Sequence, residues 1–151
     1  MPKRSAGLLI YRRTDPIEVL LVHPGGPFWA NKDDGSWSIP KGELDEIEAG
    51  LDAAKRELTE ETGLVVDGEF TPLEPIRQRG GKIVHAWAVE ADVDISSIRS
   101  NTFALEWPPR SGQIREFPEV DRVAWFDLSK ARVKILASQV GLLDQLSALI
   151  V

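Results

Sequence analysis

Three glutamates in the middle of the chain have a spacing that suits a divalent cation. Glu57, Glu60 and Glu61 stand at positions i, i+3 and i+4. If the segment from Ala49 to Thr62 is helical, the three carboxylates project from one face of that helix. Like charges at this spacing repel one another, so a cation is needed to compensate them. Mg²⁺ or Mn²⁺ fits best, because hard cations take carboxylate oxygens and keep coordination sites for water and substrate phosphate.

The residues around these glutamates resemble the signature of a known family, the Nudix hydrolases. That signature is G-x5-E-x7-R-E-U-x-E-E-x-G-U, where U is a bulky aliphatic residue. Every fixed position is matched, by Gly42, Glu48, Arg56, Glu57, Leu58, Glu60, Glu61, Gly63 and Leu64. A Trp-x-x-Pro-Lys-Gly approach to the signature and a later acid before Trp125 are also similar to the family. A solvated acidic surface is the usual alternative for a lone Glu-x-x-Glu-Glu, and the complete signature disfavours it.

The resemblance implies a hydrolase that cleaves a diphosphate linkage in a nucleoside diphosphate derivative, with Mg²⁺ or Mn²⁺ as its cofactor. It implies that Glu57 and Glu61 are the main metal ligands and that Gly42 adds its backbone carbonyl. Glu60 is then a further ligand or the base that activates water. Such metal ions polarise phosphoryl oxygens, lower the pKa of a bound water and set the in-line geometry of attack.

Three further residues are candidates for catalysis. Arg56 and Glu48 match family positions that form an ion pair and orient the acids, and an ordinary surface salt bridge is the alternative. Glu119 lies six residues before Trp125, near the point where several family members carry an extra acid that binds metal or serves as the general base. Glu116 competes for this role, and a structural role for Glu119 is the other alternative.

Candidate substrate contacts come from the loops. Lys41 precedes the signature glycine and is either a phosphate contact or an ordinary loop lysine. Arg110 presents a fork of donors that matches a phosphate. Aromatic side chains stack on any nucleobase, and Trp107 is the first choice among the candidates Phe28, Trp29, Trp87, Phe103 and Trp107. The two histidines, His23 and His85, lie on strand patterns, where packed or hydrogen-bonded roles are more common than metal ligation.

Composition limits the class of protein. A length of 151 residues predicts one domain, over residues 1–151, that buries roughly 70% of its unfolded surface. The absence of cysteine excludes disulfides and thiolate metal sites. The apolar run from Ala6 to Tyr11 is too short for a signal-peptide core or a membrane span, so we expect a soluble cytoplasmic protein. The net charge of −6 argues against tight binding to long nucleic acid, whereas a bound metal would let the acidic cluster attract a phosphate.

Hydrophobic patterns predict strands alternating with helices. The predicted strands are 6–11 and 18–23, which form a hairpin, and 37–39, 64–70, 76–79, 82–93 and 122–126. We expect a helix over 49–62 that ends at Gly63, and a C-terminal helix containing Leu142, Leu143 and Leu146. Residues 24–36 are expected to form a long loop that is a candidate lid. Residues 95–116 are the hardest to assign, and within them residues 107–112 are expected to be an ordered loop because of their Trp-Pro-Pro run. This order favours an α/β fold, a three-layer α/β/α sandwich around a mixed sheet, which the family resemblance also implies.

The exact substrate is left open by the sequence. A nucleoside or dinucleoside polyphosphate is the leading class, and the partner is therefore a small nucleotide rather than a membrane. The alternatives are a housecleaning pyrophosphatase for damaged nucleoside triphosphates and a catalytically silent module that senses a nucleotide. Loss of a signature carboxylate would favour the silent module, and none is missing. The downstream tyrosine and proline that mark two Nudix subfamilies are not at their usual offsets, and the oligomeric state has no signal in the sequence.

Overall fold

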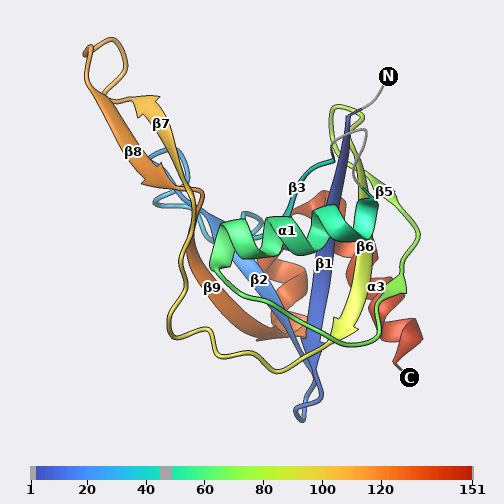
Figure 1. Cartoon of the computed structure of the whole chain (residues 1–151). Coiled ribbons are helices and arrows are strands. Elements are labelled where there is room, and N and C mark those ends of the chain that lie inside the picture. Colours follow the sequence, from blue (N-terminus) through green and yellow to red (C-terminus); the bar gives the residue numbers. More distant parts are fainter. Residues whose placement is uncertain (1–2, 45–48, 151) are drawn as a thin grey trace.

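The computed structural model describes residues 3–44 and 49–150, and within them a mixed sheet forms the centre of the molecule (Figure 1). The sheet has seven strands among these residues, in the order β4-β6-β1-β2-β9, with β3 pairing to β1 and β5 to β6. Its strands are β1 (Arg4–Arg12), β2 (Glu18–Pro24), β3 (Lys41–Glu43), β4 (Thr71–Pro72), β5 (Ile76–Arg77), β6 (Ile83–Glu90) and β9 (Val120–Asp127). β1 and β6 run parallel and the other pairs are antiparallel.

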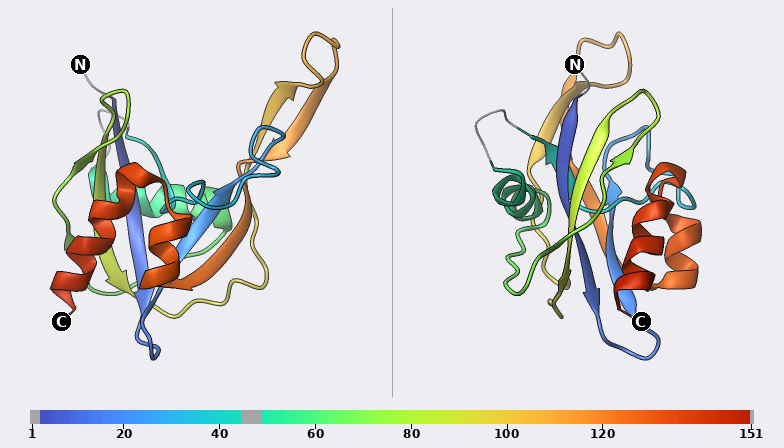
Figure 2. Two further views of the ribbon diagram at one scale, coloured as in Figure 1. Left: turned by 180° about the vertical axis from the view of Figure 1, so that it is seen from behind. Right: turned by 90° about the vertical axis from the view of Figure 1, so that its right-hand side faces the viewer.

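Helices cover both faces of this sheet, so the predicted three-layer α/β/α arrangement is confirmed (Figure 2). One layer is α1 (Gly50–Thr62). The opposite layer contains α2 (Leu128–Lys134), a short 3₁₀ turn (Ala137–Gln139) and α3 (Val140–Leu149). Within the described part of the chain, no helix has the length and apolar character needed to cross a membrane.

The central strands have side chains buried on both faces. In β1, Leu8 and Ile10 pack in the cluster on the α1 side, whereas Leu9 and Tyr11 pack in the cluster on the α2 and α3 side. Strands that are covered on both faces have nearly continuous aliphatic runs rather than an alternating pattern. This explains why the run from Ala6 to Tyr11 is so strongly apolar.

α1 forms as predicted and separates its apolar residues from its acids. Ala53, Ala54 and Leu58 are buried against the sheet. The helix ends at Gly63, which adopts a left-handed conformation with φ of 78° and donates its N–H to the carbonyl of Thr59. Glycine accepts this conformation without steric cost. The buried stripe therefore sets which way the remaining face, with its glutamates, points.

β1 and β2 diverge, and the segment before α1 enters between them. β1 pairs with β2 at Tyr11 and Arg12, and with β3 at Ser5 to Gly7. Gly7 permits this close approach, because a Cβ atom there would lie only 2.6 Å from the carbonyl oxygen of Pro40. The divergence thus brings β3, with Lys41 and Gly42, to the side of α1.

A second, two-stranded sheet lies within residues 95–118, a segment for which the sequence predicted only the loop at 107–112. β7 (Thr102–Glu106) pairs with β8 (Ile114–Pro118) in a hairpin that projects from the body of the molecule (Figure 1). The predicted loop at residues 107–112 is the tip of this hairpin, whereas the two strands beside it were not predicted. The Trp-Pro-Pro run at this tip obscured the short alternating patterns on either side of it.

Three smaller predictions also need correction. Residues 64–70 are not a strand, since pairing with β6 begins only at Thr71 and Pro72. Residues 37–39 are not a strand either, because Trp37 and Ser38 make isolated bridges to Ile135 and Val22. α2 was not predicted, although Asp127 caps its N-terminus by accepting the Lys130 N–H at 2.8 Å.

The packing of α1 leads to a stability prediction. We expect Leu58→Ala to lower the free energy of unfolding by about 2 to 5 kcal/mol, because it leaves a cavity between α1 and the sheet. Val65→Ala is the control, since Val65 is 71% exposed, and it should change stability by less than about 0.5 kcal/mol. Denaturant unfolding measures both values. Equal effects for the two variants would contradict this account of the core.

Candidate active site

The carboxylates of α1 meet β3 at the divergence of the sheet. The Lys41 backbone N–H donates to Glu61 Oε1 at 3.0 Å. Glu57 lies directly over Gly42, where a Cβ atom would come within 1.9 Å of the glutamate's carboxyl carbon. A side chain at position 42 would therefore displace the Glu57 carboxylate from the place it occupies over β3.

Arg56 connects two of the predicted metal ligands. Its Nη1 donates to Glu57 Oε1 and to Glu60 Oε2, each at 3.0 Å. The guanidinium thus restrains both carboxylates and partly offsets their charge. Glu48, the partner that the signature predicts for Arg56, lies outside the described residues.

Glu119 is brought beside these acids through backbone hydrogen bonds. Its N–H donates to the carbonyl of Asn101 at 2.8 Å, and the Asn101 N–H donates in turn to the carbonyl of Glu60 at 2.8 Å. The Gly25 N–H donates to the Glu119 carbonyl at 2.9 Å. The turn of chain before β9 is therefore attached both to α1 and to the end of β2. Glu116, the competitor in the sequence, instead lies in β8 opposite Ala104.

The pKa values of Glu57, Glu61 and Glu119 are shifted in the same direction. Burial raises the pKa of Glu61 to about 8, with further contributions from the charges of Glu57 and Glu119, against the opposing Lys41 N–H bond. Burial also raises the pKa of Glu57, although the charge of Arg56 opposes it. Partial loss of water and the charge of Glu60 raise the pKa of Glu119. The cluster therefore carries more negative charge than its protein surroundings stabilise.

The donor atoms suit a hard divalent cation. The carboxylates of Glu57, Glu60 and Glu61 and the carbonyl of Gly42 offer only oxygen, which Mg²⁺ and Mn²⁺ prefer. Over residues 3–44 and 49–150, no three carboxylate or imidazole groups converge closely enough to enclose an ion as they stand.

A pocket of about 210 Å³ opens beside the buried carboxylate. Its lining consists of Val22, Pro24, Trp29, Ser36, Ser38, Ile39, Lys41, Glu61, Glu119, Val120 and Leu136. One end is charged and the other walls are apolar or aromatic, which is the usual composition of a small-molecule site. Burial, followed by the charge of Lys82, lowers the pKa of Lys41. An anion placed beside Lys41 would therefore stabilise its ammonium form.

The two predicted substrate contacts on the hairpin are not in this pocket. Trp107 and Arg110 lie at the tip of the β7–β8 hairpin, where the Trp107 ring packs edge-on against Phe28 with centroids 5.4 Å apart. The Arg110 N–H donates to Glu106 Oε1 at 2.8 Å. Their role in substrate binding stays a prediction. Trp29, one of the other aromatic candidates, is the residue that lines the pocket.

Some residues of the site had no signal of their own in the sequence. Asn101 acts through its backbone, so its side-chain type is not informative. Ser36 and Ser38 line the pocket, but serines in a polar loop are too common to single out. His23 lies behind the pocket wall and was expected only to be packed or hydrogen-bonded, which is what it is.

Comparison with known proteins agrees with this geometry. The family model described as NUDIX domain matches residues 1–146. The chain belongs to the Nudix family. It is accordingly a phosphoanhydride hydrolase of the Nudix type, a class that hydrolyses diphosphate linkages.

Two curated relatives are similar to this Nudix protein in sequence. An RNA pyrophosphohydrolase of Bartonella henselae is 28% identical over 146 residues, covering 83% of this chain and 76% of that protein. A protein of Myxococcus xanthus called octanoyltransferase is 34% identical over 130 residues, covering 86% of this chain but 32% of that protein. The chain therefore spans about a third of the second relative's length.

Solved structures share the fold over nearly the whole chain. A Caenorhabditis elegans Ap4A hydrolase, solved as a binary complex, is 26% identical with a TM-score of 0.66, covering 97% of both chains. The NUDIX domain of Shewanella oneidensis NrtR, complexed with ADP ribose, has a TM-score of 0.71 and covers 100% of this chain and 90% of that one. At 17% identity, this second similarity concerns the fold alone.

The raised pKa of Glu61 leads to a prediction about stability and pH. An acid whose pKa is higher in the folded state than in the unfolded state holds its proton more tightly when folded, so stability is lost as pH rises. In chelator, the free energy of unfolding should fall between about pH 4.5 and pH 8, the ordinary and shifted values for Glu61. Urea unfolding across this range measures the slope.

Two variants test the assignment of this slope to Glu61. Glu61→Gln should flatten it, because the amide does not ionise. Asp52→Asn removes an exposed acid of the same helix and should leave the slope in place. An undiminished slope in Glu61→Gln would show that another group is responsible.

Proposed function

We propose that this protein is a Mg²⁺-dependent hydrolase of nucleoside or dinucleoside polyphosphates. The observation that carries the proposal is the position of Glu61, a carboxylate largely removed from water at the charged end of a pocket that also contains Lys41. Glu57 and Glu119 raise its pKa by their charge. A site of this kind needs a cation, and a cation held there attracts a phosphate.

The residues that would hold the metal are Glu57, Glu60 and Glu61, with the carbonyl of Gly42. Mg²⁺ or Mn²⁺, when bound, polarises the phosphoryl oxygens and lowers the pKa of an attacking water. Arg56 restrains Glu57 and Glu60 through its two hydrogen bonds. Lys41, which lines the same pocket as Glu61, would neutralise part of the charge of a phosphate chain bound there.

Glu119 is our choice for the general base. Its raised pKa makes it a better proton acceptor than an ordinary glutamate. It lines the pocket together with Glu61, and its backbone is held from both sides, which keeps the carboxylate near the reacting phosphate. Glu60 is the competing candidate, but Arg56 donates to one of its oxygens.

The substrate class is supported by two similarities. The relatives named RNA pyrophosphohydrolase and Ap4A hydrolase both act, by name, on nucleotides with a chain of phosphates. The pocket offers Lys41 to such a chain and Trp29 to a nucleobase. A housecleaning nucleoside triphosphate pyrophosphatase would use the same contacts, so damaged nucleotides and ADP ribose, the ligand in the NrtR complex, belong in the test panel.

The test is hydrolysis of a nucleotide panel with and without Mg²⁺. We expect release of a mononucleotide or phosphate that requires the metal. Glu61→Gln should lower kcat by about 100-fold or more, since it removes one charge from the metal site with little change in shape. Asp52→Asn is the matched control and should keep full activity.

The outcomes separate the enzyme from a silent module. Binding without turnover across the whole panel would contradict the proposal and favour a nucleotide sensor. An unchanged kcat in Glu61→Gln would show that the ligand assignment is wrong.

A second prediction concerns which aromatic residue contacts the base. Trp29→Ala should raise KM by roughly 10-fold, because stacking of a base on an aromatic ring is worth about 1 to 3 kcal/mol. Trp29→Phe should keep most of the affinity. Trp107→Ala should leave KM unchanged, as Trp107 lies at the hairpin tip. The reverse pattern would place the base on the hairpin instead.

A further inference from the structure

His23 lies behind the pocket and contacts two of the segments that form its walls. The ring is fully buried. Its Nδ1 is 2.7 Å from Asp121 Oδ1, and its Nε2 is 2.7 Å from the carbonyl oxygen of Lys32. A carboxylate and a backbone carbonyl only accept hydrogen bonds, so the ring must donate from both nitrogens. A ring with hydrogen on both nitrogens is positively charged, and Asp121 supplies the opposite charge.

Asp121 occupies a bulge in β9. The pairing of β2 with β9 runs from His23 opposite Arg122 directly to Pro24 opposite Val120, which leaves Asp121 as an extra residue. A bulge of this kind interrupts the alternation of side chains and redirects them. Val120 accordingly packs in the same cluster as Val123, although regular alternation would put them on opposite faces. The bond from His23 therefore holds the point at which β9 turns towards Glu119.

The second bond of His23 holds the loop that carries Trp29. The Lys32 N–H donates to the Trp29 carbonyl at 3.0 Å, and the Lys32 ammonium lies 5.0 Å from the centroid of the Trp29 ring. Beyond Lys32 the loop is held elsewhere, by the Gly35 N–H, which donates to Val133 at 2.9 Å. The contact to His23 is thus the attachment of this loop to the sheet next to Trp29.

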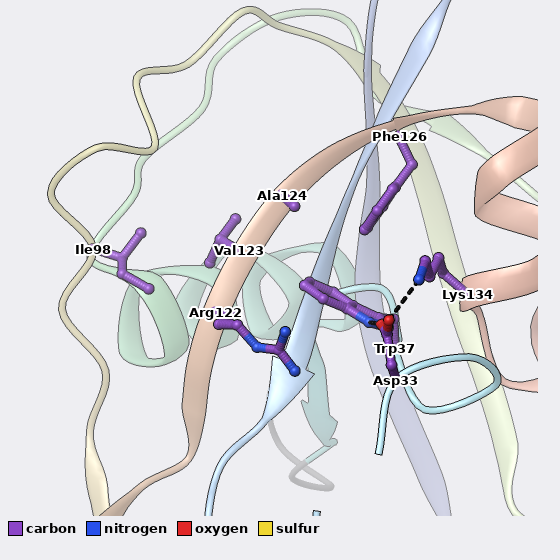
Figure 3. Close-up of a pocket in the computed structure, with 8 residues that line it drawn as sticks. All are labelled: Asp33, Trp37, Ile98, Arg122, Val123, Ala124, Phe126 and Lys134. Carbon is purple, nitrogen blue, oxygen red and sulfur yellow. Dashed lines mark hydrogen bonds and ion pairs between the residues drawn. The ribbon is translucent and has the colours of Figure 1, made fainter. Parts of the chain in front are cut away.

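Side chains on the outer side of this arrangement line a shallow cavity beside β9 (Figure 3). Trp37 packs edge-on against His23, with ring centroids 5.2 Å apart, and its indole N–H donates to Asp33 Oδ1 at 2.8 Å. Asp33 pairs with Lys134 at 2.6 Å. Arg122 lies over the Trp37 ring at 5.1 Å and is 3.8 Å from Asp121. These side chains cover His23, and the charged groups among them are paired, Asp33 with Lys134 and Asp121 with Arg122.

We propose that His23 is a positioning residue that joins the Trp29 loop to the Asp121 bulge and thereby sets the shape of the substrate pocket. This inference rests on the proposed use of that pocket. Glu119 keeps its two other backbone bonds, to Gly25 and Asn101, when the contact is lost. The other backbone bond of Trp29, from its N–H to the carbonyl of Gly26, is long at 3.4 Å and stays within the loop. Loss of His23 should therefore impair substrate binding more than the chemical step.

The kinetic test uses His23→Gln, whose amide can donate to only one of the two acceptors. We expect KM to rise about tenfold and kcat to change by less than about threefold, because one hydrogen bond to the charged ring is lost. His85→Gln is the matched control, as the other histidine of the chain lies in β6. It should leave both constants unchanged. Thermal unfolding of each variant gives the folded fraction.

A purely structural role for His23 gives a different result. In that case kcat would fall in proportion to the unfolded fraction while KM stayed constant, and this outcome would overturn the proposal. Asp121→Asn keeps the shape of the contact but removes its charge, so it should raise KM in the same direction by a smaller factor. This variant also decides the question if His23→Gln does not fold, since an unchanged KM in Asp121→Asn contradicts the inference.

Nuclear magnetic resonance tests the contact without any substrate. In protein labelled with ¹⁵N-histidine, His23 should show two ring N–H groups in the absence of nucleotide. A ring with a single N–H would overturn the proposal. Because this measurement does not depend on turnover, a failure of the nucleotide panel would count against the proposed function and leave the result for His23 standing.

Discussion

The buried carboxylate of Glu61 is the constraint on which the rest of the site depends. A carboxylate removed from water is costly unless it gains a partner, and among the described residues the donor to Glu61 is the backbone N–H of Lys41. Glu57 lies close by, over Gly42, where a side chain would displace its carboxylate. Steric and electrostatic contacts thus connect the signature residues in space. The sequence signature shows the spacing of these residues but not the contacts between them.

The divergence of β1 and β2 is what makes this arrangement accessible to a substrate. β3 fills the near end of the gap and brings Gly42 under α1. The far end is bordered by the loop with Trp29 and by Glu119, and it forms the pocket. One feature of the sheet therefore supplies both the position of the metal ligands and the space beside them, while the buried stripe of α1 keeps its acids facing that space.

The features that depend on local sequence patterns could be predicted, whereas those that depend on contacts between distant segments could not. The helix, its glutamates and the first hairpin follow from spacing within about ten residues of sequence. Glu119 was placed by its offset from Trp125, but its proximity to α1 arises from the backbone of Asn101. Trp107 was preferred over Trp29 because the sequence does not show which loop folds back to the carboxylates. The β7–β8 hairpin was missed because a Trp-Pro-Pro run interrupts it.

The charge of the site links stability to function. Proteins tolerate unfavourable electrostatics mainly where a ligand later relieves them. The raised pKa values of Glu57, Glu61 and Glu119 reflect burial first and, added to it, an unrelieved repulsion between neighbouring acids. A cation that binds the folded site but not the unfolded chain removes that repulsion, and the free energy released adds to its affinity. The electrostatic cost of building the site is therefore also the source of its attraction for a metal ion. The bound metal would in turn attract a phosphate, which a protein of net charge −6 would otherwise repel.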